Sequence, residues 1–311
     1  MMVLCYHKIC DVGHDWNDIV TSPDTFRKQL EYINDTIGFI SVKELDKDLE
    51  SDKVLLTFDD GFEDNYFNVL PILEEMKLPA LFFATTATLE KREETWCNEL
   101  VWLFLEGTEY PRSMNLRVNE KKETYKTGTL KDRLEVYRSI RKYLLGAEIE
   151  IRNELFREIR TYPGVNFPEK RNTHYMLSIE QLKRLAQSEY VTVGCHTVSH
   201  RSLALLSEKE QYEEIKNSKN VLESTLGRTI EYFAYPFGGI YDYSPKTVEI
   251  LRNLGFSAAF STTYKRWSKE KSKFEIPRVC ISECSLKEFE EKIKQYRNKA
   301  SYCFKEKREL L

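Results

Sequence analysis

An apolar run rich in β-forming residues ends at two adjacent carboxylates and a glycine in the stretch Val54-Leu55-Leu56-Thr57-Phe58-Asp59-Asp60-Gly61. Val54 to Phe58 has the composition of a strand buried on both faces, as in parallel sheets. Such strands present catalytic groups at their carboxyl ends. No basic residue follows before Lys77, so a metal ion, or a proton on one carboxyl group, is needed to relieve the repulsion. Taken alone, the stretch also fits a solvated Asp-Asp-Gly turn.

Strands and helices alternate on both sides of this stretch, and that alternation predicts a parallel α/β sheet or barrel. We expect further strands at 2–6, 80–84, 190–194, 230–235, 256–261 and 276–281. We expect helices at 23–33, 41–49, 65–76, 178–186, 207–226, 244–254 and 285–297.

Between about residues 90 and 175 the alternation stops. The segment contains long charged helices, such as 130–145 and 148–159, and few β-rich runs. We therefore expect one domain over residues 1–311, with an inserted helical subdomain at about 90–175. The insertion could cover a substrate cleft, or it could only cover core surface.

Composition and charge exclude several classes of protein. The 311 residues are 41% hydrophobic and 31% charged, which is typical of a soluble globular protein. The net charge of −3 argues against a dedicated nucleic-acid binder. The N-terminus resembles no signal peptide, and no segment approaches the roughly 20 apolar residues of a membrane span. The seven cysteines include no Cys-X-X-Cys pair, so we expect reduced thiols and a cytoplasmic protein.

Two of the five histidines, His196 and His200, lie four residues apart just after an expected strand. On a helical turn this spacing places both imidazoles on one side, where they can share one ion. A lone histidine is most often structural, whereas a pair at this position indicates a metal. One carboxylate from Asp59-Asp60 completes a set of two histidines and one carboxylate, which leaves positions open for water and substrate.

A third motif, Phe233-Ala234-Tyr235-Pro236-Phe237-Gly238-Gly239, follows another expected strand, although alone it is only a strand-to-loop exit. In their order, Thr57 to Gly61, His196 to His200 and Phe233 to Gly238 resemble the motifs of the polysaccharide deacetylases of carbohydrate esterase family 4, the family of the chitooligosaccharide deacetylases. The resemblance covers residues 2–86 and about 176–282 and does not extend to the insertion.

The resemblance implies a distorted (β/α)7-type barrel and metal-dependent removal of an N-acetyl group from an amino sugar. Carried over to this chain, Asp59 is the general base that activates water, and Asp60, His196 and His200 hold a divalent metal ion, for which we expect zinc. The ion lowers the pKa of water and polarises the amide carbonyl, while the free carboxylate takes the proton. We also expect the backbone amide at Gly61 or nearby to stabilise the oxyanion.

Two positions depart from the family pattern. The third motif often carries an arginine that orients the catalytic carboxylate, but Ala234 stands there. Arg278, near the end of the last expected strand, is the candidate replacement, with a surface salt bridge as the alternative. Many members have a late histidine as general acid, and none follows His200 here. His7 is the candidate for that role, with a buried structural histidine as the alternative.

We therefore expect a metal-dependent deacetylase whose partner is an N-acetylated sugar or glycan of the cell envelope or surface, either a polymer or a lipid- or nucleotide-linked precursor. The alternatives are a metal-dependent hydrolase of another non-peptide C–N amide bond and a catalytically decayed glycan-binding protein. Phe237, Leu203 and Trp267 are candidates for the wall around the acetyl methyl group, although each also fits ordinary packing. Thr197 and Ser199 could orient the histidines or cap their turn.

Overall fold

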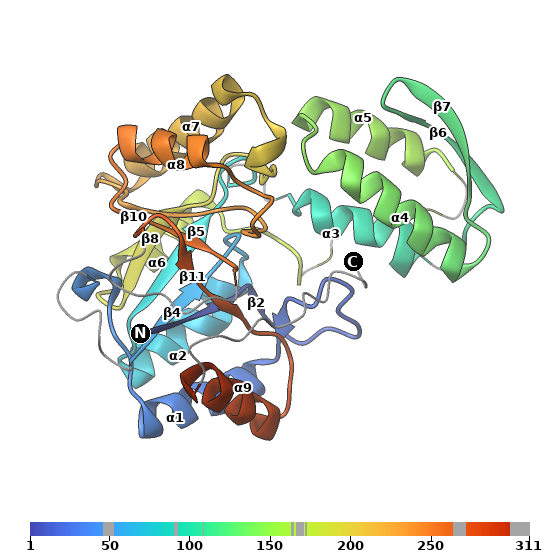
Figure 1. Ribbon diagram of the computed structural model, residues 1–311. Coiled ribbons are helices and arrows are strands. Elements are labelled where there is room, and N and C mark those ends of the chain that lie inside the picture. Colours follow the sequence, from blue (N-terminus) through green and yellow to red (C-terminus); the bar gives the residue numbers. More distant parts are fainter. Residues whose placement is uncertain are drawn as a thin grey trace. The chain divides into compact units, whose positions relative to one another are not determined.

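The computed structural model describes residues 1–45, 53–89, 93–107, 109–162, 165, 171, 173–263 and 272–298 (Figure 1). The described chain divides into two compact units. The first comprises Met1–Glu93 and the described residues from Met176 onward, and the second comprises Glu94–Tyr175. The first unit holds the large parallel sheet and every residue of the predicted site.

The first unit is built on a sheet of eight strands in the order β11-β10-β9-β8-β5-β4-β1-β12, in which every neighbouring pair is parallel. The strands are β1 Met2–Tyr6, β4 Val54–Phe58, β5 Ala80–Ala84, β8 Val191–Cys195, β9 Tyr232–Ala234, β10 Ala258–Ser261, β11 Ile276–Pro277 and β12 Val279–Cys280. A separate small sheet pairs β2 Lys8–Ile9 with β3 Val20–Thr21.

The last two strands nearly close the sheet into a barrel. β11 pairs with β10 at one end of the sheet, and β12 pairs with β1 at the other. Only Arg278 separates β11 from β12, so the segment Ile276–Cys280 occupies one strand position and bridges both ends. Pro277 lacks a backbone N–H, which favours a change of partner at this point. With this segment counted once, the barrel has seven strand positions, and the predicted (β/α)7-type fold is confirmed.

Alternate residues of the strands face two different apolar layers, as the two-residue period of a strand requires. Val3, Leu55 and Phe83 belong to a cluster formed mostly by strand residues, which fills the barrel and also includes Met1, Ile40, Val42 and Leu45. Leu4, Leu56 and Phe82 belong to a larger cluster that includes helix residues, between the sheet and its helices. The strands are therefore buried on both faces, which explains their continuous apolar runs.

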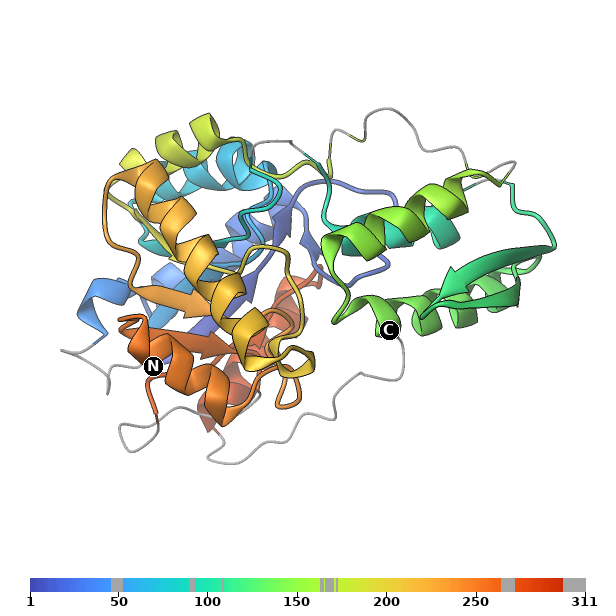
Figure 2. The same cartoon turned by 90° about the horizontal axis from the view of Figure 1, so that it is seen from above.

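Helices surround the barrel, and Figures 1 and 2 show α7 beside α8 and α1 beside α9. Five of these helices begin at a serine whose hydroxyl accepts a hydrogen bond from a backbone N–H of the first turn. These serines are Ser22, Ser178, Ser207, Ser244 and Ser285. Each such cap contributes about 1 kcal/mol. The helices are α1 Pro23–Thr36, α2 Leu70–Met76, α6 Ile179–Gln187, α7 Glu208–Leu226, α8 Pro245–Asn253 and α9 Leu286–Asn298, with 3-10 turns Val42–Glu44 and Leu203–Leu205.

The expected elements of this unit are present, most with ends within two residues of the expected ones. The expected helix at 65–76 begins as a π-helical turn, Asn65–Val69, before α2. Pro71 cannot donate an N–H within the helix, which explains the irregular start. The expected helix at 41–49 is only the short turn Val42–Glu44, with its capping box present, and residues 46–49 lie outside the described residues.

The second unit contains α3 Trp96–Val101 with a π-helical continuation Trp102–Glu106, α4 Leu130–Leu144 and α5 Ile149–Arg160. It also contains an antiparallel hairpin of β6 Ser113–Val118 and β7 Lys121–Lys126, which is not among the expected elements. β7 is largely exposed and lacks apolar alternation, so periodicity gives no sign of it. Asn119 and Glu120 form the two-residue turn between the strands, and both have positive φ, as such hairpin loops require.

Two whole-chain expectations bear on location. None of the helices in the described part of the chain is both long and apolar enough to cross a membrane. The six cysteines of the described part, Cys5, Cys10, Cys97, Cys195, Cys280 and Cys284, carry free thiols.

Gly194 of β8 allows the close packing of the barrel, which leads to a stability prediction. A Cβ added there would lie 2.6 Å from Cδ1 of Phe83 and 2.9 Å from the carbonyl oxygen of Tyr232. Gly194→Ala should therefore lower the free energy of unfolding by about 1–3 kcal/mol, as overpacking does. Urea unfolding followed by circular dichroism measures the change. Gly13→Ala is the control, since nothing lies within 4 Å of a Cβ added there. Equal unfolding midpoints for the two variants would contradict this packing.

Candidate active site

The predicted site residues meet at the carboxyl ends of the barrel strands. His7 follows β1, the two aspartates follow β4, the two histidines follow β8, and Arg278 lies between β11 and β12. The N–H of Asp59 donates to the carbonyl of Tyr6 at 2.9 Å, so the β1–β4 ladder continues beyond both strands. The residues brought together are His7, Asp59, Asp60, His196, His200 and Arg278.

Asp60 points at both histidines. Its Oδ1 lies 3.4 Å from Nε2 of His196 and 3.2 Å from Nε2 of His200. This oxygen is buried and makes no hydrogen bond of normal geometry. A buried carboxylate oxygen without a hydrogen-bond partner is costly, and a cation held between these three atoms would satisfy it. Asp60, His196 and His200 therefore fit a metal ion, and they form one of the clusters of potential ligands in the described residues.

The Nδ1 atom of His196 fixes how that ring faces Asp60. Nδ1 lies 2.8 Å from the carbonyl oxygen of Ala234. Nδ1–H donates to this carbonyl, so a neutral ring presents the lone pair of Nε2 to Asp60. Burial acts to lower the pKa of His196, but the carboxylates of Asp59 and Asp60 outweigh it and raise the pKa. Burial likewise acts to raise the pKa of Asp60, and the His200 and His196 rings bring it well below its usual value. The cluster favours a positive charge at its centre, supplied by a proton or a metal.

A strained turn directs the Asp60 side chain. Asp60 has φ of 72°, and the N–H of Gly61 donates to the carbonyl of Asp59 at 2.9 Å. An i to i+2 bond around a residue with positive φ makes a γ-turn of the rare, strained kind. The Gly61 N–H is thus already bonded, and the expected oxyanion donor, at Gly61 or nearby, stays a prediction. Thr85 holds the turn through its N–H and its hydroxyl, which donate to the carbonyl of Asp60 at 3.1 and 3.0 Å.

The two histidines share one side of a tight turn, but that turn is not helical. Thr197 has φ of 67° and His200 has φ of 54°. The rings lie 4.9 Å apart between centroids. Thr197 caps the turn, because its Oγ1 accepts from the N–H of His200 at 3.1 Å. The four-residue spacing brings both rings to one side of the turn as expected, although left-handed residues rather than a helix produce this arrangement.

Asp59 has entirely different partners. Arg278 donates to both of its oxygens, from Nη1 to Oδ1 at 2.6 Å and from Nη2 to Oδ2 at 2.7 Å. Burial acts to raise the pKa of Asp59, but the guanidinium of Arg278 outweighs it and lowers the pKa. Arg278 is fully buried, which excludes the alternative of a surface salt bridge. Its Nη1 and Nε also donate to Thr57 Oγ1 and the Ser261 carbonyl, each at 3.3 Å.

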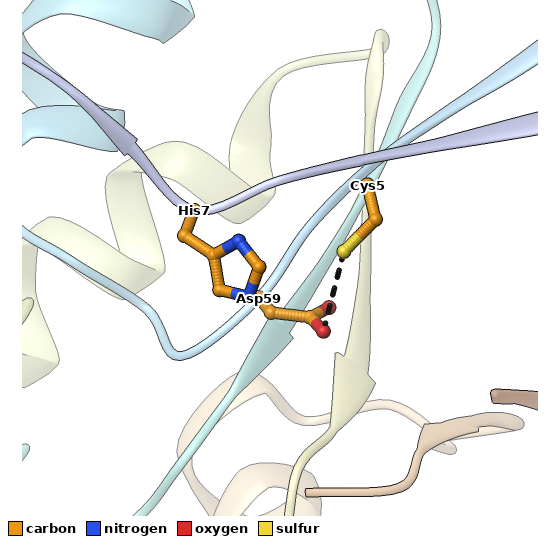
Figure 3. Close-up of side chains that lie close together, drawn as sticks. All are labelled: Cys5, His7 and Asp59. Atoms are coloured by element: carbon orange, nitrogen blue, oxygen red, sulfur yellow. Dashed lines mark hydrogen bonds between the residues drawn. The ribbon is translucent and has the colours of Figure 1, made fainter. Parts of the chain in front are cut away.

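Cys5 of β1 and His7, just after β1, also lie beside Asp59, as Figure 3 shows. The Cys5 thiol donates to Oδ2 of Asp59 at 3.5 Å. Burial raises the pKa of Cys5 well above its usual value, so the thiol keeps the proton it donates. A nitrogen of His7 lies within 4.8 Å of a carboxylate oxygen of Asp59. His7 is partly exposed, and its Nδ1, which is buried, has no hydrogen-bond partner.

The described residues thus contain two neighbouring clusters that could hold a metal, Asp60-His196-His200 and Cys5-His7-Asp59. In the second cluster, Arg278 already occupies both oxygens of Asp59. A cation there would face a buried guanidinium, which like-charge repulsion disfavours. The electrostatics therefore favour Asp60, His196 and His200 as the metal ligands.

Of the three candidates for the wall around the acetyl methyl group, only Phe237 is seen beside a site residue in the described part of the chain. Phe237 contacts His200 edge to face, with ring centroids 4.7 Å apart. Phe237 also occupies a γ-turn, with φ of 62° and a bond of 2.7 Å from the Gly238 N–H to the Pro236 carbonyl. Leu203 is fully buried in the layer between sheet and helices, which is ordinary packing. Trp267 lies outside the described residues.

Sequence reasoning missed Cys5, Thr57 and Ser261, which contact Asp59 or Arg278. Thr57 opens the first motif, but neither its contact with Arg278 nor the contacts of Cys5 and Ser261 follow from a pattern of neighbouring residues. Thr57 and Cys5 are register partners on neighbouring strands, which follows only from the sheet order.

The chain belongs to the polysaccharide deacetylase family. The model of that family matches residues 46–112 and 157–259, more than half of the chain. The curated relative YxkH of Bacillus subtilis (strain 168), whose name assigns it to the polysaccharide deacetylases, is 24% identical over 106 residues. That match covers 34% of this chain and 37% of YxkH, so the chain aligns with well under half of that relative.

Several solved structures, two of them named as deacetylases, share the fold. The deacetylase PplD of Streptococcus pyogenes, in complex with acetate, has a TM-score of 0.58 at 20% identity and covers 91% of this chain and 92% of its own. IcaB of Ammonifex degensii has a TM-score of 0.58 at 22% identity and covers 95% and 96%. The deacetylase domain of BpsB from Bordetella bronchiseptica has a TM-score of 0.54 at 15% identity and covers 91% and 96%.

The buried pair of Asp59 and Arg278 gives a prediction about stability. Arg278→Met leaves the Asp59 carboxylate buried without its cationic partner, which should lower the free energy of unfolding by about 3–5 kcal/mol. Adding Asp59→Asn removes the stranded charge and should restore part of that loss. Chemical denaturation of the metal-free wild type, both single variants and the double variant gives the coupling energy. Strict additivity of the two losses would contradict a direct pair.

Proposed function

We propose that this protein is a metal-dependent hydrolase that removes N-acetyl groups from an amino sugar in a glycan or glycan precursor. The observation that carries the proposal is the division between two adjacent carboxylates. Asp60 faces two imidazoles, whereas Asp59 is held by Arg278. Membership of the polysaccharide deacetylase family supports the reaction class, and the PplD structure includes acetate, the expected product.

Asp60, His196 and His200 would hold the metal ion. Two imidazole nitrogens and one carboxylate oxygen suit zinc, and three protein ligands leave a position open, as in catalytic zinc sites. When bound, the ion would act as a Lewis acid on the amide carbonyl and lower the pKa of water. Asp60 and His196 are almost fully buried, so the chain itself excludes bulk water from that side of the site.

Asp59 is suited to accept the proton of the attacking water. Its lowered pKa keeps it ionised at neutral pH. A carboxylate has about four lone-pair positions; Arg278 uses one on each oxygen, and Cys5 uses another on Oδ2. One position on Oδ1 remains for a water molecule. Arg278 takes the place of the missing arginine at Ala234 by fixing the direction of that position.

His7 is suited to deliver a proton to the leaving amine. It stands beside Asp59 and is partly exposed, while its buried Nδ1 has no hydrogen-bond partner. A general acid must reach a substrate nitrogen, and the exposed part of the ring would make that contact. The helical insertion expected at about 90–175 in this single deacetylase domain is supported only in its middle, because the family model passes over residues 113–156 and matches the residues on either side.

The two aspartates should respond differently to the same substitution. Asp60→Asn should lose zinc together with activity, because a charged ligand is removed. Asp59→Asn should retain about one zinc ion per chain, as a single three-ligand site does, and release no acetate. Zinc content by atomic emission and acetate release from N-acetylated sugars and oligosaccharides test both. Loss of zinc in Asp59→Asn with retention in Asp60→Asn would contradict the assignment.

The same assay separates the alternative functions. Faster hydrolysis of N-acetyl amides that contain no sugar would favour another amide hydrolase. Zinc binding without acetate release, combined with oligosaccharide binding that survives Asp59→Asn, would favour a glycan-binding protein.

His7→Ala should reduce kcat by about 10²–10⁴-fold, the usual contribution of a general acid. The zinc content should remain unchanged, because His7 lies outside the proposed ligand set. His14→Ala is the matched control, since His14 is exposed in a loop and packs on Trp16. Turnover of His7→Ala near the wild-type value would refute the acid role.

A further inference from the structure

We propose that Glu214 of α7 is a positioning residue that sets the metal affinity of the site by holding the turn between the two histidines. The inference rests on the proposed metal site of Asp60, His196 and His200. Glu214 lies in α7, outside the three sequence motifs, so the motifs gave no indication of this role.

Glu214 accepts hydrogen bonds from the middle of the histidine turn. Its Oε2 accepts from the backbone N–H of Val198 at 3.1 Å and from that of Ser199 at 2.9 Å. Its Oε1 accepts from Oγ of Ser199 at 2.6 Å. These are charge-assisted bonds, which are shorter and stronger than neutral ones. Three donors from two consecutive residues therefore fix the backbone midway between His196 and His200.

The turn needs such an anchor because its backbone is strained. Thr197 and His200, on either side of the segment that Glu214 binds, both have positive φ. A β-branched residue such as Thr197 is a genuine outlier in that region. Strained residues persist only when the surrounding structure over-determines them. Relaxation of either residue would turn an imidazole away from Asp60, whose oxygen now lies 3.4 and 3.2 Å from the two Nε2 atoms.

The start of α7 places Glu214 for this task. Ser207 and Glu210 form a capping box that fixes where the helix begins. Glu214 lies four residues after Glu210, on the same face. The buried Arg201 reaches both, with Nη2 at 2.9 Å from Oε1 of Glu210 and Nη1 at 4.0 Å from Oε1 of Glu214. Arg201 follows His200 directly, so it ties the end of the turn to the same helix face.

The effect is expected on metal binding rather than on the chemical step. Glu214 contacts the backbone and Ser199, and neither ring of the histidine pair is among its hydrogen-bond partners. Groups that orient metal ligands typically change metal affinity by about 10–100-fold when they are replaced. A purely structural role would instead lower the unfolding temperature of the metal-free protein and leave the zinc dissociation constant unchanged.

The test is a zinc titration of the metal-free full-length protein against a chromophoric chelator, at a temperature where each variant is folded by circular dichroism. Glu214→Gln replaces one acceptor oxygen by an NH2 group that cannot accept, and should weaken zinc binding by about 10-fold or more. Glu213→Gln is the matched control, because Glu213 is exposed and accepts a bond from Asn217 at 3.2 Å on the same helix. Its zinc affinity should equal that of the wild type.

Ser199→Ala provides a second, milder variant in case Glu214→Gln does not fold. It removes only the hydroxyl bond to Glu214 and should weaken zinc binding measurably, though by less than Glu214→Gln. In the double variant the two effects should not add, because both act through one contact. Unchanged zinc affinity in Glu214→Gln, or in Ser199→Ala if only that variant folds, would overturn the proposal.

The titration contains no substrate, so its outcome is separate from the deacetylase activity. A wild type that binds zinc but releases no acetate would contradict the proposed function and leave the role of Glu214 standing. A wild type that binds no zinc would contradict the metal site and this inference together.

Discussion

The buried ion pair between Arg278 and Asp59 joins the architecture of the barrel to its chemistry. Arg278 lies at the one position where the last strand segment changes partner, from β10 to β1. Its guanidinium reaches the Ser261 carbonyl at the end of β10, Thr57 in β4 and both oxygens of Asp59. The contacts that help close the barrel therefore also orient the carboxylate assigned as general base. A buried charge pair is stabilising only when its remaining hydrogen bonds are satisfied, and here Thr57 and Ser261 help to satisfy them.

This pair makes two neighbouring aspartates chemically different. Asp59 is neutralised by the protein, whereas Asp60 is left facing two imidazoles. The separation requires Asp60 to leave the direction of its strand at once, and a γ-turn with positive φ achieves this. Thr197, His200 and Phe237 also have positive φ, so all three motif loops contain left-handed residues. Strain of this kind collects at functional sites, where surrounding contacts maintain it.

Local features of the sequence predicted the strands, most helix starts and the pairing of His196 with His200, because apolar runs, serine caps and residue spacing are properties of neighbouring residues. The resemblance to a family supplied the (β/α)7-type barrel and the candidate role of Arg278. The sequence could not show that Cys5 donates to Asp59 or that Glu214 holds the histidine turn, since both contacts depend on sheet order and helix packing. The sequence also contained no sign of the backbone angles that bond the Gly61 N–H within a γ-turn and make the turn between His196 and His200 non-helical. The hairpin β6–β7 was missed because its outer strand is exposed on both faces.

As proposed, Asp60, His196 and His200 bind the metal ion, and Asp59 does not. X-ray absorption at the zinc edge, on protein loaded with one equivalent of zinc, tests this most directly. Zinc bound by Asp60, His196 and His200 should have nitrogen and oxygen neighbours at about 2.0–2.2 Å and no sulfur neighbour. A sulfur neighbour at about 2.3 Å would place the ion with Cys5, His7 and Asp59 instead, and would contradict the division of the two carboxylates into a ligand and a base.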